Sequence, residues 1–473
     1  MSAELPRVLV IASDTIGARM AGSGIRYWNL ARAIGAQQRV TLATPSETTL
    51  APPMGVVITP YGSPGSTADE RGHRLAALVA AHDVIVAQHL PYMHTDAEVL
   101  ASRHVVVDLY APWILEKLEY SRVDPKRGEL DRRDDVAILN RLLSLGDYFI
   151  CASERQRDFW LGALAAAGRL ELDHAVADPQ LRTLIDIVGF GLPDDLPRKT
   201  GPGPRATFDG IGPDDRVLLW NGGIWNWLDP LSAIRAVGRL TVELPNLRLV
   251  FMGMRSPGAQ VAAMSVVETA RSLAAELGLL DRHVFFNDWV DYEERQNWLL
   301  EADASISLHL DTAEARYAFR TRMLDNIWCG LPSLVTCGDV LADVVEHEGI
   351  GETAPPGDID AVVEGIRHVF DRDRARAMRT NLASMRGRYT WEAVSAPLLA
   401  YCRAPWKLGT RAGRDVSAEY VAGLERMYSE TAEYARLLEQ AIDEKNKTLA
   451  GATPLRQRTR PDLGALFRRD KRG

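Results

Sequence analysis

Short apolar runs rich in β-branched residues alternate with longer amphipathic stretches in the first part of the chain. Strands that are buried on both faces read as such continuous runs, and their alternation with helical sequence is typical of a parallel sheet covered by helices. The runs span residues 7–13, 39–44, 83–88, 104–110 and 147–153. The pattern predicts a first Rossmann-like α/β domain over residues 1–195.

Residues 191–213 interrupt this alternation, because they are rich in Pro, Gly and Asp and poor in apolar pairs, as linkers between domains are. The pattern then restarts, with apolar runs at residues 216–223, 247–253, 283–289, 304–310 and 332–338. We expect a second Rossmann-like domain over residues 210–395. Open α/β sheets bind ligands beyond the carboxyl ends of their strands. The predicted fold class is therefore α/β, with two parallel-sheet domains facing a ligand-binding cleft.

The last part of the chain has a different pattern. Side chains recur there at alternating spacings of four and three residues, which is typical of a helix that packs against another helix. They are Tyr420, Leu424, Met427, Thr431, Tyr434, Leu438 and Ala441. We predict a helical extension over residues 415–450. Because the seam is short, docking onto the body of the protein and a homodimer through residues 415–445 both stay open.

Residues 451–473 form a basic tail. Its last nineteen residues, LRQRTRPDLGALFRRDKRG, hold seven basic and two acidic side chains. Charge runs of this kind are typical of disordered, solvated termini. The alternative is peripheral contact with an anionic membrane surface or with an acidic partner.

Composition and charge narrow the class of protein. Of the 473 residues, 46% are apolar and 25% are charged, which is typical of a folded, soluble protein. The formal net charge of -8 lacks the basic footprint of a nucleic-acid-binding protein. The four cysteines have no C-x-x-C spacing, so neither a disulfide framework nor a zinc site is expected. The chain shows no secretory leader and no run of eighteen apolar residues, and we expect a cytoplasmic protein.

Glycines follow the first predicted strand of each domain. In SDTIGARMAGSGIRYWNLARAIG, Gly17, Gly22 and Gly24 precede a helix that should begin near Ile25. In RVLLWNGGIWNW, the second domain places Asn221, Gly222 and Gly223 at the end of its first strand. Glycines at such turns let backbone N–H groups approach a phosphate or a sugar, and a helix dipole adds to the attraction. Both domains should present these glycines to the same cleft.

The segment RYAFRTRMLDNIWCGLP, residues 316–332, concentrates charge before an apolar stretch. Arg320, Arg322 and Asp325 lie within six residues of one another. One interpretation is a solvated helix start with salt bridges to neighbours, and the other is a seat for an anionic ligand. The i, i+2 spacing of the two arginines predicts that they do not point the same way.

The order of these elements resembles the retaining glycosyltransferases of the GT-B fold, family 4, over about residues 5–405. The segments that carry the resemblance are AGSGIRYWNLARAIG, DYFICASERQRDFW, FFNDWVDYEERQNWLLEADASISL and LDNIWCGLPSLVT. The family has two acidic residues eight positions apart before a Gly-x-Pro turn. LDNIWCGLP places Asp325 at the second position, where the family's residue holds the ribose hydroxyls. Tyr317 stands at the first acidic position, and Glu314 is the nearest upstream carboxylate. Either residue therefore stays a candidate to replace the family's first acidic residue.

The resemblance also implies the roles of other residues. The family grips the diphosphate with an arginine and a lysine that NGGIWNWLDP lacks, so we expect Arg320 and Arg322 to supply that charge. The implied donor site further includes Trp289, Val290, Tyr317, Phe319 and Thr321, beside Gly22, Gly24 and Asn221–Gly223. His89, at the end of a strand, is a candidate catalytic residue, and Asp108 and Tyr110 are candidates for the acceptor rim.

The implied reaction is transfer of a glycosyl group from a nucleotide diphosphate sugar to an acceptor hydroxyl with retention, without metal or cofactor. GDID, residues 357–360, contains a D-x-D, but its place before a helix predicts an N-cap instead of a metal site. Two alternatives are a sugar-nucleotide 2-epimerase, for which no acid and base pair stands out, and an inactive GT-B scaffold or binding subunit. The donor base, the sugar and the acceptor stay open.

Overall fold

The computed structural model describes residues 5–18, 20, 22–63, 65–88, 97–121, 125–254 and 265–408, and Ile442 and Lys445. The chain divides into two compact units, Met1–Ala412 and Gly413–Gly473. Apart from Ile442 and Lys445, the predicted helical extension over residues 415–450 lies outside the described residues. The same is true of the basic tail over residues 451–473.

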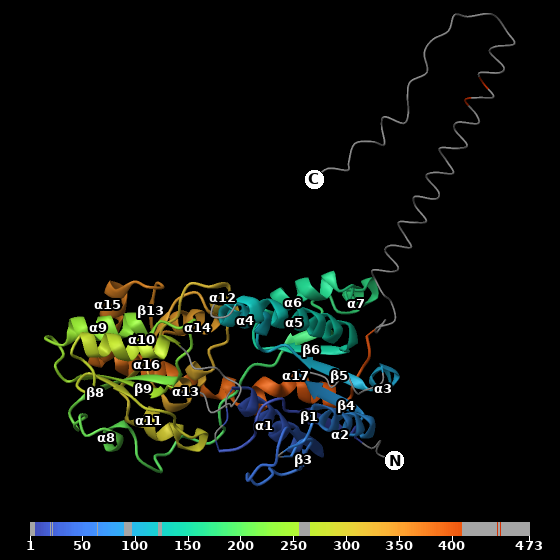
Figure 1. Cartoon of the computed structure of the whole chain (residues 1–473), viewed down its shortest axis with the longest axis horizontal. Coiled ribbons are helices and arrows are strands. Elements are labelled where there is room, and N and C mark those ends of the chain that lie inside the picture. Colours follow the sequence, from blue (N-terminus) through green and yellow to red (C-terminus); the bar gives the residue numbers. More distant parts are fainter. Residues whose placement is uncertain are drawn as a thin grey trace, which may run out of the picture. The chain divides into compact units, whose positions relative to one another are not determined.

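A seven-stranded parallel sheet organises the first part of the larger unit, in the order β3-β2-β1-β4-β5-β6-β7 (Figure 1). Its strands are β1 (Val8–Ile11), β2 (Val40–Thr44), β3 (Val56–Pro60), β4 (Val84–Ala87), β5 (His104–Asp108), β6 (Tyr148–Cys151) and β7 (Ile185–Ile187). Its helices are α1 (Gly22–Gly35), α2 (Ala68–Ala81), α3 (Ala97–Ser102), α4 (Trp113–Ser121), α5 (Pro125–Leu145), α6 (Glu154–Ala166) and α7 (Leu172–Ala177).

A six-stranded parallel sheet follows, in the order β10-β9-β8-β11-β12-β13. Its strands are β8 (Arg216–Gly223), β9 (Leu247–Gly253), β10 (Val284–Phe286), β11 (Ala304–Ser307), β12 (Ser333–Thr336) and β13 (Gly351–Ala354). The helices of this part begin with α8 (Pro204–Thr207), α9 (Pro230–Leu240), α10 (Ser265–Glu276), η1 (Tyr292–Glu294), α11 (Arg295–Glu301), α12 (Ala313–Tyr317) and α13 (Arg322–Cys329). They end with α14 (Val340–Glu348), α15 (Ile359–Phe370), α16 (Arg372–Met385), η2 (Arg386–Tyr389) and α17 (Trp391–Arg403). The predicted class of two parallel-sheet α/β domains is confirmed.

All ten strands expected from the apolar runs are present, and three further strands escaped the sequence pattern. β3, β7 and β13 each lie at one edge of a sheet. Most of their residues are only half-buried or exposed. A strand covered on fewer sides does not need a continuous apolar run, and therefore leaves a weaker signal in the sequence.

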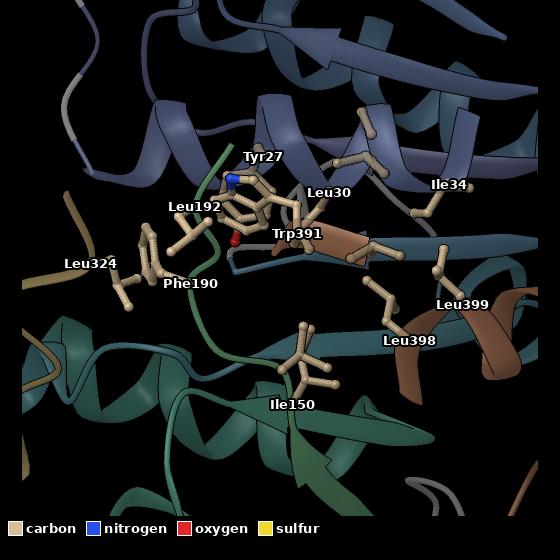
Figure 2. Packing of buried hydrophobic residues seen from close by; sticks show 14 of the residues in the cluster. Tyr27, Leu30, Ile34, Ile150, Phe190, Leu192, Leu324, Trp391, Leu398 and Leu399 are labelled. Carbon is tan, nitrogen blue, oxygen red and sulfur yellow. The ribbon is translucent and has the colours of Figure 1, made fainter. Parts of the chain in front are cut away.

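The last helix of the larger unit returns to the first sheet. α17 packs against α1, where Tyr27, Leu30 and Ile34 meet Trp391 and neighbouring leucines (Figure 2). The rings of Tyr401 and Tyr148 stack with centroids 4.7 Å apart. The helix therefore extends past residue 395 and completes the core of the first sheet.

Side chains cap the starts of two helices, and the cap at GDID is the one expected from the sequence. The Ser153 side chain accepts a hydrogen bond from the backbone N–H of Gln156 at the start of α6. Asp358, the first aspartate of GDID, accepts from the N–H of Ala361 at the start of α15. The D-x-D sequence therefore acts as an N-cap. Among the residues that the structure describes, none of the helices has the length and apolarity required to cross a membrane.

Candidate functional site

A cavity of about 380 Å³ is lined by residues that follow strands of both sheets. The first part of the chain contributes Asp14, Gly22, Ser23, Tyr110, Ala111, Pro112 and Glu116, and the segment after β7 contributes Phe190. From the second part come Trp225, Trp227, Glu314, Ala318, Phe319, Arg320, Thr321 and Arg322. The carboxyl ends of the strands thus converge on one site, as expected for open α/β sheets.

Of the glycines described in the segment after β1, Gly22 lines this cavity. A Cβ atom added to Gly22 would meet nothing within 4 Å, and this glycine lines the cavity. A Cβ atom on Gly24 would lie 2.7 Å from the carbonyl oxygen of Thr15, so Gly24 allows close packing of the turn on α1. Ser23 donates a hydrogen bond to Asp14, with Oγ 2.9 Å from Oδ2.

The two candidates for the acceptor rim have different surroundings. Tyr110 lines the cavity, whereas Asp108 is fully buried beneath it. Asp108 accepts two hydrogen bonds from Arg26, at 2.6 Å from Nε and 2.9 Å from Nη2. The interpretation of Asp108 as a rim residue is therefore wrong, because its carboxylate forms a buried ion pair with Arg26. The two residues lie 82 positions apart in the sequence.

The first candidate acidic residue, Glu314, is paired with the first candidate arginine. Glu314 is 2% exposed, and its two carboxylate oxygens accept from Arg320 at 3.1 and 2.7 Å. This two-bond geometry is the strongest that a guanidinium and a carboxylate form. Asp339 lies farther away, 3.8 Å from Nε of Arg320. The cavity wall therefore contains a largely neutralised ion pair at this point.

Arg322 has a different environment, although it lies only two positions along the chain. Its Nη2 donates to the carbonyl oxygen of Gly223 at 3.0 Å, whereas its buried Nη1 has no hydrogen-bond partner. Within the described ranges, no carboxylate lies at salt-bridge distance from it. Burial and the neighbouring Arg320 cation lower the pKa of the Arg322 guanidinium to about 9. An anion in the cavity would restore the stability of this cation.

The second glycine turn is built around Arg322. Asn221 donates from Nδ2 to the carbonyl oxygen of Arg322 at 2.8 Å. Gly222 adopts a φ of 97°, a conformation that favours glycine, and a Cβ atom there would lie 3.6 Å from the guanidinium carbon. Asn221, Gly222 and Gly223 therefore support the arginine at the start of α13, where the backbone N–H groups of Met323 and Leu324 already donate to Arg320 and Thr321.

Asp325, the candidate for the ribose hydroxyls, already has a protein partner. Its Oδ1 accepts from Nε of Arg295 at 3.0 Å. Arg295 is itself enclosed by the rings of Tyr292 and Trp328, with its guanidinium carbon 3.8 and 4.8 Å from the two centroids. The residues that line the cavity do not include Asp325. Only the second carboxylate oxygen remains available for a ligand.

The other donor-site candidates separate into two groups. Phe319 and Thr321 line the cavity. Tyr317 points elsewhere, since its ring lies 4.9 Å from that of Phe159 on α6. Val290 is buried among apolar side chains of the second part of the chain. The ring of Trp289 covers Gly253, and a Cβ atom added to Gly253 would lie 2.8 Å from that ring. His89 lies outside the described residues.

The cavity-lining residues that sequence reasoning missed include two tryptophans and a glutamate. Trp225 and Trp227 stack with ring centroids 5.6 Å apart and an interplanar angle of 5°. Their i, i+2 spacing in NGGIWNW was a signal that both rings would lie on one side of an extended segment. Glu116 lies on α4, and nothing in the amphipathic pattern of that helix marks this glutamate. Only the approach of α12 to α4 places it opposite Glu314.

Comparison with known proteins identifies the fold. No family model and no curated protein matches the sequence. Sucrose-phosphate synthase from Thermosynechococcus elongatus superposes with a TM-score of 0.60 at 16% identity, over 83% of this chain and 97% of that chain. HepE from Anabaena in complex with UDP-glucose gives a TM-score of 0.56 at 15% identity, over 84% and 98%. WaaG, a glycosyltransferase involved in lipopolysaccharide biosynthesis, gives 0.54 at 16%, over 84% and 100%. The chain has the GT-B fold.

Proposed function

We propose that this protein transfers a glycosyl group from a nucleotide diphosphate sugar to an acceptor hydroxyl, with retention and without a metal. The observation that carries the proposal is Arg322, a largely buried cation whose free Nη1 and whose lowered pKa call for an anion in the cavity. The similarity to HepE, which was crystallised with UDP-glucose, and to the glycosyltransferase WaaG supports a nucleotide sugar as the source of that anion.

The chemistry that this site would perform follows from its charges. Breaking the bond between the anomeric carbon and the diphosphate builds negative charge on the departing phosphate. Arg322 would meet that charge and stabilise the transition state more than the ground state. In this scheme the departing phosphate takes the proton of the acceptor hydroxyl, and no separate base is required.

Glu314 would orient the hydroxyls of the transferred sugar. Each of its carboxylate oxygens accepts one hydrogen bond from Arg320 and keeps a further lone pair. Because Arg320 fixes the carboxylate by two bonds, Glu314 has one orientation before the sugar arrives, which lowers the entropic cost of binding. Asp325 would contact the ribose through the oxygen that Arg295 leaves free.

A thermal-shift panel tests the proposal. UDP, GDP and ADP, each beside its nucleoside, are added to the full chain, and a diphosphate that binds should raise the melting temperature, since a ligand at a hundred times its Kd stabilises by about 2.7 kcal/mol. The matching nucleotide sugar is then incubated with the protein, with and without EDTA, and release of the diphosphate is measured. The anomeric configuration of the product by NMR decides between retention and inversion. Absence of diphosphate binding across the panel would refute the proposal.

The paired state of Asp325 favours a second candidate, an inactive subunit that binds a nucleotide sugar for a partner enzyme. In the described structure, Arg295 already holds Asp325, the candidate for the ribose hydroxyls. Arg320 already holds Glu314, the candidate for the sugar hydroxyls. Diphosphate binding without hydrolysis or transfer of any donor sugar would support this candidate over the enzyme.

A further inference from the structure

The cavity has two carboxyl groups to which the proposed donor chemistry assigns no role, Asp14 and Glu116. Glu116 belongs to α4, which contacts α12, and it lines the cavity together with Glu314 and Arg320. It comes from the first part of the chain, whereas the arginines come from the second. The two walls of the cavity therefore carry different charges.

The Glu116 carboxyl group lacks a hydrogen-bond donor among the described residues. In the part of the chain that the structure describes, its carboxyl group forms neither a hydrogen bond nor an ion pair. Asp14 on the same wall differs, because it accepts from Ser23 and from the backbone N–H of Thr15. Burial and then the charge of Glu314 raise the pKa of Glu116 to about 7, and Arg320 only partly opposes them. A ligand hydroxyl would supply the missing donor.

The charges that line the cavity fall into two sets. Glu314 is neutralised by Arg320, which leaves Arg322 as the cation of the second part and Asp14 and Glu116 as the acids of the first. A diphosphate is attracted to Arg322 and repelled by Glu116. The rings of Tyr110 and Phe190, which also line the cavity with centroids 5.2 Å apart, offer an apolar surface against which a sugar or an aryl group can pack.

We propose that Glu116 is an acceptor-binding residue that accepts a hydrogen bond from an acceptor hydroxyl, so that the protein selects neutral or cationic polyols with an apolar face over phosphorylated or carboxylated ones. This inference rests on the proposed function, because it assigns to the acceptor the carboxylate that repels the donor diphosphate.

A matched pair of probes tests it directly. 4-Nitrophenyl β-D-glucoside and 4-nitrophenyl β-D-glucuronide differ by one carboxylate, and their binding to the full chain is measured by titration calorimetry at pH 8. We expect the glucoside to bind at least roughly tenfold more tightly, because the glucuronide brings a second anion toward Glu116. Glu116→Gln should weaken the glucoside roughly tenfold and strengthen the glucuronide. Glu47→Gln, a change at an exposed carboxylate, is the control and should alter neither.

The pH dependence separates this role from a structural one. As the pH rises from 6 to 8, Glu116 loses its proton and becomes the stronger acceptor, so the affinity for the glucoside should increase. Glu116→Gln should remove that increase. The charged and titratable groups around Glu116 are Glu314 and Arg320 from the α12 side, Tyr110 after β5, and Lys117 on α4, paired with Asp135 of α5.

Each outcome has a definite meaning. Changes of the same sign for both probes in Glu116→Gln, equal affinities in the unchanged protein, or no binding of the glucoside at millimolar concentration would overturn the assignment of Glu116. Nucleoside diphosphate binding is measured in parallel. If the diphosphate does not bind while the probes still discriminate, the proposed donor chemistry fails and the charge selection by Glu116 stands.

Discussion

Two buried arginines, Arg26 and Arg322, show how the same side chain serves a core and a cavity. Arg26 is fully buried and uses its donors on Asp108 and on the carbonyl oxygens of Val188 and Gly189, at 2.6 to 2.9 Å. Arg322 has one backbone acceptor and one buried nitrogen with none. Both sit beside aromatic rings, so burial alone does not distinguish them.

The pKa values of the two groups express this difference. Burial alone would lower the pKa of Arg26, but the Asp108 carboxylate outweighs it and the pKa rises above its ordinary value. For Arg322, burial and the Arg320 cation outweigh the attraction of the Asp339 carboxylate, and its pKa falls. A guanidinium with all donors used belongs to the scaffold, and one with a free donor on a cavity wall is suited to a ligand.

The largest effect is expected from removing the core arginine. Arg26→Met would leave Asp108 as an uncompensated buried charge, and loss of one partner of such a pair costs about 3–5 kcal/mol of unfolding free energy. Urea unfolding followed by tryptophan fluorescence measures the loss. Arg26→Met combined with Asp108→Leu should recover part of it. A loss under about 1 kcal/mol in the single variant would contradict the structural role.

Removing the cavity arginine should not lower stability, but it should weaken ligand binding. Arg322→Ala should leave the unfolding free energy unchanged or higher, because it removes an under-compensated cation. It should weaken nucleoside diphosphate binding by about 1.5–3 kcal/mol, the value of a charge-assisted hydrogen bond, and scarcely change nucleoside binding. Calorimetry with both ligands checks this, and Arg316→Ala at an exposed position of α12 is the control. Equal losses for nucleoside and diphosphate would indicate damage to the fold.

Arg320 is an intermediate case, because it is paired and yet lies on the cavity wall. Glu314→Gln keeps the shape of the partner and removes its charge, so it should lower turnover roughly tenfold while free nucleotide affinity stays nearly intact. Tyr317→Phe should be tolerated, because the Tyr317 ring packs against Phe159. Steady-state kinetics with the donor identified by thermal shift measures both. A silent Glu314→Gln beside an inactive Tyr317→Phe would reverse the assignment.

Removing the C-terminal unit should have the smallest effect on the stability that depends on Arg26 and on the diphosphate binding that depends on Arg322. Trp406 donates to the carbonyl oxygen of Thr183, and its ring packs against Tyr401, so the cut belongs after Leu408 and not after Pro405. Stability and diphosphate affinity should stay the same, whereas the oligomeric state should change if residues 415–445 form a homodimer. Sedimentation of both chains measures this, and monomers in both cases would rule out the dimer.

Much of the scaffold could be predicted because strand runs and helix caps are local signals. The ten strands that the apolar runs predicted and the cap at Asp358 each depend on residues within a few positions of one another. The structure brings Gly22, Phe319 and Arg322 to one cavity, and these residues were candidates through the glycine pattern, the charge of residues 316–332 and the family resemblance. The edge strands β3, β7 and β13 could not be predicted, because exposure leaves them without an apolar run.

The sequence by itself determined the alternation of strands and helices, and with it two parallel sheets whose strand ends carry arginines and glycines. Only the tertiary structure decided which charges remain available. Asp108 is taken by Arg26, Asp325 by Arg295 and Glu314 by Arg320, and Glu116 and Arg322 are left to face the cavity. The physical reason is that an ion pair depends on distance in space, and the burial that gives an unpaired charge its chemical meaning exists only after the chain has folded.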